Sequence, residues 1–323
     1  MTPRDAFGAR RHARGGSGQA VIPKRPAGPR RRLGGGPLAI VLATGLMAFQ
    51  DALIKLMSDG LPLWQFFALR SLLILPVLAI PVWRRGGMRA AVHPRTLTRS
   101  GLIVAMYVFF YGGMPVLDLP VISAVYYTGP VFIVILSSLL LRERVTPGQA
   151  GAVAVAFAGV VIVLRPGGET FSPAALIPLL SALCYALAAV ATRGPLGRVD
   201  PWALTFSLNV VFVAAGGIGM TVTAAIGRPE AYPFLLSPWT ALEAGVMSLL
   251  VFLAAISVAI HLLLARAYQL GPMPVVAGLD FSYLVFAVVW AALLFGTIPE
   301  GATVVGTVLV AAGGLWGILR RGH

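Results

Sequence analysis

Four charged residues stand inside long apolar stretches of this sequence, where charges are rare. Asp51 and Lys55 are four residues apart, a spacing that places both side chains on one face of a helix. Arg70 lies in the following apolar stretch and Asp280 in a later one. A charge in the lipid interior costs at least about 2.5 kcal/mol, so such a residue normally faces a partner or a watery cavity on the path of a substrate or proton.

The first two stretches bring opposite charges to the same depth. If they form antiparallel helices, Arg70 is about eight residues, or roughly 12 Å, into the second helix. Asp51 then lies at nearly that depth on the first. We therefore predict an ion pair between Asp51 and Arg70, which Lys55 could join. The pair would either pin the two helices together or act directly on a substrate or proton.

A second cluster combines His261 with Asp280. If the segments that carry them form a connected antiparallel pair of helices, both side chains lie at similar depth. An imidazole that titrates near neutral pH, beside a carboxylate, is a suitable relay for proton-coupled transport. The alternative for His261 is a structural hydrogen bond between helices, and Asp280 is the stronger candidate for a cavity.

Aromatic residues stand near these charges and could orient a cargo or stack on a planar one. In membrane helices such residues also serve packing or the interfacial belt. The candidates for the binding site are Tyr107, Tyr111, Tyr126, Tyr127, Phe281 and Tyr283.

The composition shows which elements must position these groups. Of 323 residues, 58% are hydrophobic and 11% charged, and the mean hydropathy is +0.87, which disfavours a soluble enzyme, a disordered protein and a disulfide scaffold. Runs of about 20 apolar residues, separated by Gly, Pro and Arg, predict an all-α integral membrane protein of about ten transmembrane helices. The predicted spans are 37–57, 62–83, 99–115, 119–141, 147–164, 173–192, 201–225, 241–267, 272–295 and 301–319.

The net charge of +14 is distributed as an orientation signal rather than as a nucleic-acid surface. Nine basic residues precede position 33, and 21 of the 25 fall in the tail or in loops on one predicted side, against two on the other. We predict an inner-membrane protein with both termini cytoplasmic. Residues 1–35, rich in Arg, Gly and Pro, are expected to be a disordered tail.

Neither a metal site nor a cofactor is expected. The single cysteine, Cys184, and four scattered histidines have no zinc-binding spacing, and the chain lacks a phosphate-binding glycine loop. The expected partners are a small-molecule substrate and the lipid bilayer, with a homodimer as a possibility and no nucleic acid.

Sliding the chain by 154 residues superposes similar positions. Pro120 falls on Pro274 and Gly159 on Gly313. The alignment predicts two five-helix repeats, 36–168 and 169–323, which must be inverted because each half has an odd number of spans. A cavity is expected where the halves meet, and there Tyr126 corresponds to Asp280.

A family resemblance adds to this interpretation. Residues 119–168, with a central Pro130, an Arg-Glu-Arg turn around Glu143 and a glycine-punctuated helix, resemble the EamA type of the drug/metabolite transporter superfamily. The motifs DALIKLM and PLWQFFALRSLL in the first two spans are also similar, and the likeness extends over about residues 37–319. The second half lacks an acidic residue at the position equivalent to Glu143. We expect Glu143 to be a structural residue paired with Arg142 or Arg144.

The resemblance implies a ten-helix carrier of small metabolites. The mixed charges favour an amino-acid-like zwitterion carried by alternating access, and a planar metabolite such as riboflavin or S-adenosylmethionine is the alternative cargo. A non-transporting membrane scaffold and a lipid-modifying membrane enzyme are the rival classes.

Overall fold

The structure is a computed structural model, and it consists of helices and connecting segments in the part of the chain that it describes. The predicted tail, apart from its last residue, lies outside that part. The described residues are 35–57, 61–113, 125–164, 176–226, 233–242, 244–296 and 301–319.

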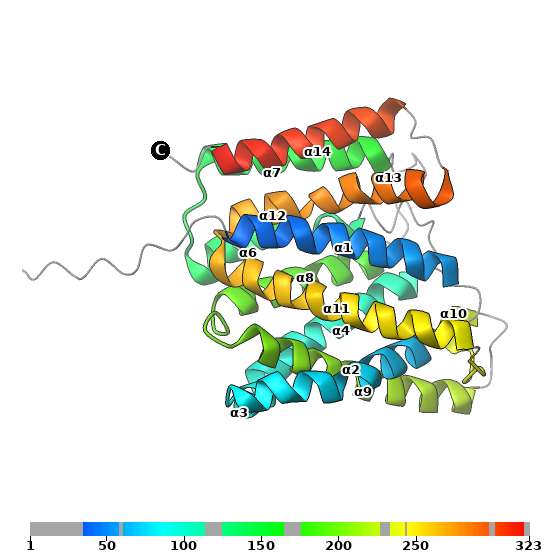
Figure 1. Cartoon of the computed structure of the whole chain (residues 1–323). Helices are drawn as coiled ribbons and strands as arrows, with labels where there is room; N and C mark the ends of the chain where they lie inside the picture. Colours follow the sequence, from blue (N-terminus) through cyan, green and yellow to red (C-terminus); the bar gives the residue numbers. More distant parts are fainter. Residues whose placement is uncertain are drawn as a thin grey trace, which may run out of the picture. The chain divides into compact units, whose positions relative to one another are not determined.

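The long helices follow the apolar stretches of the sequence, and α3 and α10 are single short turns between them (Figure 1). The bounds are α1 Gly35–Met57, α2 Leu63–Arg84, α3 Met88–Ala91, α4 Pro94–Gly113, α6 Gly129–Leu141, α7 Pro147–Leu164, α8 Leu176–Arg193, α9 Pro201–Ile226, α10 Pro233–Leu236, α11 Ala244–Leu270, α12 Met273–Asp280, α13 Ser282–Phe295 and α14 Gly301–Leu319.

These helices confirm the all-α membrane architecture. Within the described residues, six helical stretches are long and apolar enough to cross a membrane, and α6, α7 and α14 contain shorter apolar stretches. The helix α4 begins five residues before the predicted start at position 99. Its first turns carry Arg95 and Arg99, so hydropathy alone places the start too late.

The predicted span 272–295 is not one continuous helix. It divides at Phe281 into α12 and α13, and Asp280 is the last residue of α12. A similar turn at Tyr127 and Thr128 precedes α6, where Pro130 stands in the first helical turn. Proline therefore marks one interruption but not the other, and the hydropathy pattern predicted neither, because 119–141 and 272–295 were each expected to be a single helix.

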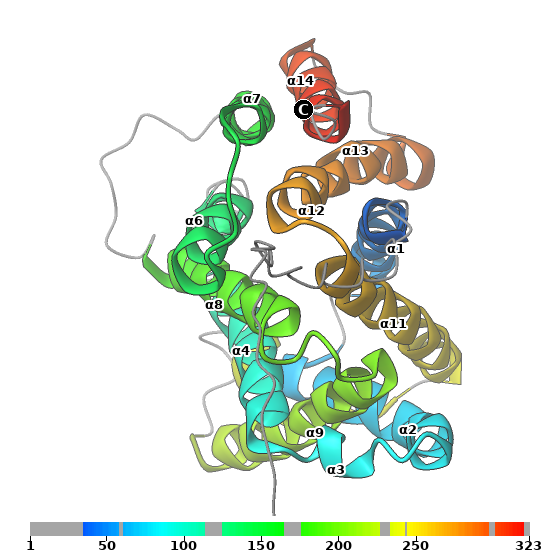
Figure 2. The same cartoon turned by 90° about the vertical axis from the view of Figure 1, so that its left-hand side faces the viewer.

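The helices form two similar sets of neighbours. In Figure 2, α1 lies between α11 and α13, whereas α8 lies between α4 and α6. The helices α7 and α14 pack against each other, as do α2 and α9. Gly159 and Gly313 permit the first contact, because a Cβ at either position would lie within 2.7 Å of backbone atoms of the partner helix.

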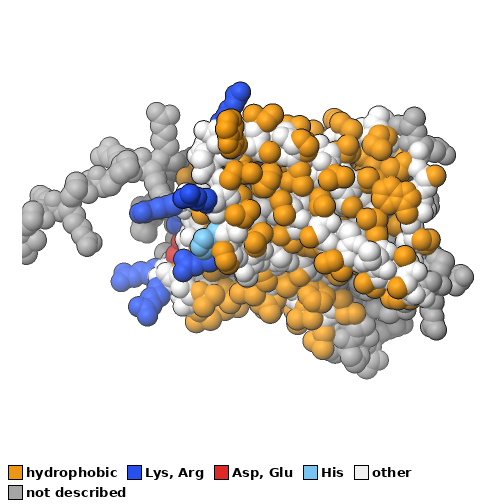
Figure 3. All heavy atoms as spheres, turned by 90° about the horizontal axis from the view of Figure 1, so that it is seen from below, with side chains coloured by type: hydrophobic (Ala, Val, Ile, Leu, Met, Phe, Trp, Pro, Cys, Tyr) orange, Lys and Arg blue, Asp and Glu red, His pale blue; other side chains and the backbone are white. Residues whose placement is uncertain are grey.

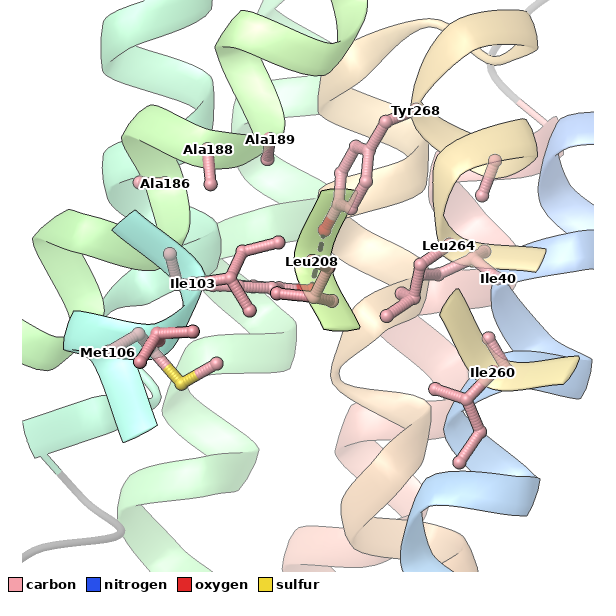
Figure 4. Close-up of a cluster of buried hydrophobic side chains, with 14 of the residues drawn as sticks. Ile40, Ile103, Met106, Ala186, Ala188, Ala189, Leu208, Ile260, Leu264 and Tyr268 are labelled. Atoms are coloured by element: carbon pink, nitrogen blue, oxygen red, sulfur yellow. Dashed lines mark hydrogen bonds between the residues drawn. The ribbon is translucent and has the colours of Figure 1, made fainter. Parts of the chain in front are cut away.

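The main hydrophobic core is built from most of these helices. Figure 4 shows side chains from α1, α4, α8, α9 and α11 converging, including Ile40, Ile103 and Leu208. Large apolar residues also point outwards, among them Leu72, Leu139 and Leu293 at 57% to 69% exposure. An apolar outer surface around a packed interior is what a multi-pass membrane protein requires.

Exposed basic side chains gather at one end of the helices in the face shown in Figure 3. That end carries the link between α2 and α4, the link between α6 and α7, and the link between α8 and α9. The exposed arginines of these links are Arg84, Arg85, Arg89, Arg95, Arg142, Arg144 and Arg198.

Candidate functional site

The carboxylate of Asp280 accepts two hydrogen bonds from tyrosines in the interior. Tyr185 on α8 donates to Oδ2 at 2.6 Å and Tyr268 on α11 donates to the same oxygen at 3.0 Å. The two hydroxyl oxygens are 2.8 Å apart, and Asp280 is only 5% exposed. Three helices thus converge on one buried carboxylate with no cation among its described hydrogen-bond partners.

Asp280 lies at the point where the span is interrupted. It is the last residue of α12, and Phe281, in the N-cap position of α13, separates it from that helix. Its own helix, α12, is wholly buried. Discontinuous helices at membrane depth are typical of binding sites in carriers, because their ends offer unpaired backbone groups.

Asp51 forms the second buried carboxylate site. Its Oδ2 accepts a hydrogen bond of 2.7 Å from Tyr283 on α13. About two turns earlier on α1, Thr44 and Ser282 share a hydrogen bond of 2.8 Å. The polar contacts therefore join α1 to the start of α13, next to the interruption.

The predicted ion pair between Asp51 and Arg70 is wrong for this conformation. The described side chains form no contact between these two charges within 4.0 Å. Arg70 instead lies between the rings of Phe66 and Phe212, with its Cζ 5.0 and 4.7 Å from their centroids. The side chain of Lys55 lies outside the described part.

The predicted pairing of His261 with Asp280 is also wrong. His261 Nδ1 donates to the carbonyl oxygen of Ser257, one turn earlier on α11, at 2.6 Å. Ser257 Oγ lies 3.3 Å from the same nitrogen. Similar depth did not bring the two groups together, because His261 satisfies its hydrogen bond within its own helix while the tyrosines occupy the carboxylate.

The tyrosines lie together to an extent that the sequence did not indicate. Seven of the eight belong to one connected set of ring contacts, in which Phe110 links Tyr111 to Tyr126. Tyr127, Tyr126 and Tyr185 connect the Tyr283 end of this set to the Asp280 end, with centroid separations of 5.6 to 6.3 Å. The eighth lies outside the described residues.

Phe281 is not in a position to stack on a cargo in this conformation. It is fully buried, and its ring lies 6.4 Å from that of Tyr127. Tyr127 is itself buried, whereas Tyr107, Tyr111, Tyr126 and Tyr283 are half-buried. The half-buried tyrosines are thus the better candidates for contact with a ligand.

Tyr268 was missed as a candidate. It follows His261 by seven residues on the same face of α11, so two turns of helical spacing could have identified it. Its hydroxyl is set among apolar side chains such as Leu208 and Leu264 (Figure 4). In such surroundings a hydroxyl needs a partner, and Asp280 provides one.

Glu143 pairs with Arg193, and not with Arg142 or Arg144 as predicted. Its Oε1 accepts a hydrogen bond of 2.7 Å from Arg193 Nε, and its Oε2 accepts one of 3.2 Å from the backbone N–H of Met273. Arg193 Nη1 also donates to the carbonyl of Gln269 at 2.9 Å. This network, here called the Glu143 latch, ties the ends of α6, α8 and α11 to the start of α12.

A cavity of about 140 Å³ lies between α1 and α12–α14, and neither Asp51 nor Asp280 lines it. Ser282 supplies the only polar side chain in its lining, so it suits an apolar group rather than a charged ligand. The lining residues are Val41, Gly278, Leu279, Ser282, Val285, Phe286, Val310 and Ala311.

A comparison with protein families matches residues 34–165 to the model of the EamA-like transporter family. A riboflavin transporter of Rhizobium johnstonii is 28% identical over 74% of this chain and 76% of its own length. The pseudopaline exporter CntI of Pseudomonas aeruginosa is 26% identical over 85% of this chain and 93% of its own. An S-adenosylmethionine uptake transporter of Rickettsia bellii is 24% identical over 61% of this chain and 63% of its own length.

The fold also matches a solved crystal structure. The match covers 88% of this chain and 99% of the other, with a TM-score of 0.73 and 20% sequence identity. At that identity the likeness establishes the arrangement of helices alone. The three relatives above are transporters, so chemistry on a bound substrate is not the shared activity.

Proposed function

We propose that this chain, whose residues 34–165 match the model of the EamA-like transporter family, carries an amino-acid-like zwitterion across the inner membrane by alternating access. The coarser activity, membrane transport of a small metabolite, is that of its relatives. The proposal concerns the cargo, the site and the orientation of the chain.

The observation that carries the proposal is the buried carboxylate of Asp280. A carboxylate without a cation in the interior is costly, and the hydroxyls of Tyr185 and Tyr268 offset only part of that cost. A cationic group on a cargo would supply the missing charge. The amine of a zwitterion therefore binds at Asp280 or at Asp51, and the tyrosine hydroxyls orient it.

Buried charge of both signs supports a zwitterion over a simple cation. Arg70 is 2% exposed, so the interior offers a guanidinium group as well as carboxylates. A cargo with one positive and one negative group can pair with one residue of each sign without changing the net charge of the site.

A planar metabolite is the second candidate cargo. The connected aromatic rings favour it, because half-buried faces such as those of Tyr107 and Tyr126 can stack on a conjugated ring. Relatives named as riboflavin and S-adenosylmethionine transporters agree with this alternative.

We also propose that the chain consists of two inverted repeats offset by 154 residues. The interruptions at Tyr127 and Phe281 differ by that offset, and so do the left-handed residues Arg142 and Gly296 that end α6 and α13. In this arrangement both termini are cytoplasmic, on the side of the exposed arginines. A reporter protein that is active only in the cytoplasm should therefore be active when it is fused to the carboxyl terminus. An inactive fusion would contradict this orientation.

Substitution of the carboxylates tests the site. In cells that produce the carrier, uptake or export of labelled amino acids should fall at least tenfold in Asp280→Asn and in Asp51→Asn, while the amount of protein in the membrane stays normal. Asp200→Asn is the matched control, because Asp200 pairs with Arg85 outside the spans. If both buried variants transport at the wild-type rate, the site assignment is wrong.

A further inference from the structure

Arg70 is a buried cation whose donors are largely unused. Its side chain is 2% exposed, and its Nε and Nη2 atoms are buried with no hydrogen-bond partner in the described part of the chain. A guanidinium has five N–H donors, and burying them unpaired is costly. A structural arginine would be expected to bind a carboxylate or backbone carbonyls.

The walls around Arg70 are aromatic rather than anionic. Phe66 on α2 and Phe212 on α9 lie against the guanidinium, at 5.0 and 4.7 Å from Cζ to the ring centroids. Contacts with ring faces stabilise the cation but leave the in-plane N–H groups available. The donors therefore remain ready for a planar anion that approaches in the plane of the guanidinium.

Two candidate partners within the chain, Asp51 and His261, do not occupy these donors. Asp51 accepts a hydrogen bond from Tyr283, and His261 donates to Ser257. Neither is within ion-pair or hydrogen-bond distance of Arg70 among the described contacts. An anion that comes from outside the chain is the remaining way to satisfy this group.

Two tyrosines on α4 complete the surroundings. Tyr107 and Tyr111 are stacked, with centroids 6.3 Å apart and 16° between the ring planes. The ring of Tyr107 also contacts Phe212, at 5.7 Å, so it adjoins the wall that holds Arg70. The described residues include no hydrogen-bond partner for either hydroxyl, and both side chains are half-buried.

We propose that Arg70, together with the hydroxyls of Tyr107 and Tyr111, binds the carboxylate of the cargo. This inference rests on the proposed transport function and adds the negative pole of the zwitterion to it. A guanidinium fork matches the two oxygens of a carboxylate, and phenolic hydroxyls donate to the remaining lone pairs. Asp51 uses one oxygen for Tyr283 and has the other available for the amine.

Binding of benzoate, a minimal carboxylate with one ring, tests this site without knowledge of the cargo. Titration of the purified full-length protein, followed by its intrinsic fluorescence, should show saturable binding of benzoate and none of benzamide. Arg70→Gln should weaken benzoate binding at least tenfold. The affinity of Arg70→Lys for benzoate should lie between those of the wild type and Arg70→Gln. This variant keeps the positive charge but loses the paired N–H donors of the guanidinium.

Two further variants separate a binding role from a structural one. Tyr107→Phe keeps the ring and should weaken benzoate binding several-fold. Arg99→Gln removes a second buried arginine, whose Nε donates to Thr192 at 3.1 Å and whose Nη1 has no partner among the described residues, and it should leave benzoate binding unchanged because the aromatic walls and tyrosine hydroxyls lie at Arg70. The melting temperature of Arg70→Gln should not fall, since the variant removes an unpaired buried charge.

The remaining results overturn the inference. Benzoate binding that is absent from the wild type, or unchanged in Arg70→Gln, contradicts a carboxylate site at Arg70. Saturable binding of inorganic phosphate in place of benzoate contradicts the assigned ligand class. The transport rate of Asp280→Asn distinguishes failure of this inference from failure of the proposed function. If that variant still loses transport, the proposed function stands without the carboxylate site. If it transports at the wild-type rate, the proposed function is refuted on its own.

Discussion

At the scale of single residues, the site depends on hydroxyl groups that donate to buried carboxylates. Asp280 receives hydrogen bonds from two tyrosines, and Asp51 from one. A hydrogen bond to a charged group contributes about 1.5–3 kcal/mol, which corresponds to roughly 10- to 150-fold in binding or rate. The tyrosines should therefore affect transport as well as packing.

Tyr185→Phe and Tyr268→Phe each remove one donor from Asp280 while keeping the ring. We expect each variant to lower the transport rate at least about tenfold, with Tyr185→Phe the more severe because its bond is shorter. Ser248→Ala, which removes a hydroxyl bonded within α11, is the control. Transport rates are measured and normalised to the amount of protein in the membrane. If the tyrosine variants transport as fast as this control, the expectation is wrong.

A second residue-scale prediction concerns stability. Arg142, at the end of α6, has a φ of 54°, a left-handed conformation that costs a non-glycine residue about 1–2 kcal/mol. Arg142→Gly should therefore raise the free energy of unfolding by up to about 1 kcal/mol and the melting temperature by a few degrees. Arg144→Gly makes the same change in charge at a position without positive φ and should not stabilise. A lower melting temperature for Arg142→Gly would oppose this explanation.

At the scale of helices, α2 and α9 approach closely because small residues lie between them. A Cβ added at Gly216 would lie 2.7 Å from the carbonyl oxygen of Trp64 and 2.8 Å from the backbone nitrogen of Ala68, whereas one at Gly217 would meet nothing within 4 Å. Gly216→Ala should lower the free energy of unfolding by about 1–3 kcal/mol. Gly217→Ala should be neutral or slightly stabilising. Equal melting temperatures for the two variants would show that this contact is not tight.

The Glu143 latch predicts coupling between helix ends. Glu143→Gln and Arg193→Gln each break the ion pair, in which the side chains are 22% and 18% exposed. Because the partners are in direct contact, the double variant should be less destabilised than the sum of the single variants, with a coupling of about 1 kcal/mol. A double-mutant cycle of melting measurements gives this value directly. Strict additivity would mean that the bridge contributes nothing.

At the scale of the whole molecule, composition and periodicity were sufficient for the membrane fold. Helices in lipid must satisfy their backbone internally, so apolar runs of sufficient length predict α1, α2 and α9 almost to the residue. The interruption at Phe281 was not predictable in this way. No proline or glycine adjoins Phe281 in the chain, and the hydrogen bonds to Asp280 come from other helices.

The site was predictable in its residue types but not in its pairings. A buried charge in lipid signals function from the sequence alone, which identified Asp51, Arg70 and Asp280. Which partner each residue contacts depends on how helices rotate and pack. Depth along a helix does not contain that information, and Arg70 and His261 were therefore assigned the wrong partners.

Counterflow in proteoliposomes is the test on which the proposed function depends most. Vesicles that contain the purified carrier and an unlabelled zwitterionic amino acid inside should accumulate the labelled compound from outside, and vesicles with the Asp280→Asn carrier should not. Asp200→Asn should behave as the wild type. Accumulation at the wild-type rate by Asp280→Asn, or accumulation of only uncharged planar metabolites, would contradict a zwitterion carrier that binds its cargo at this carboxylate.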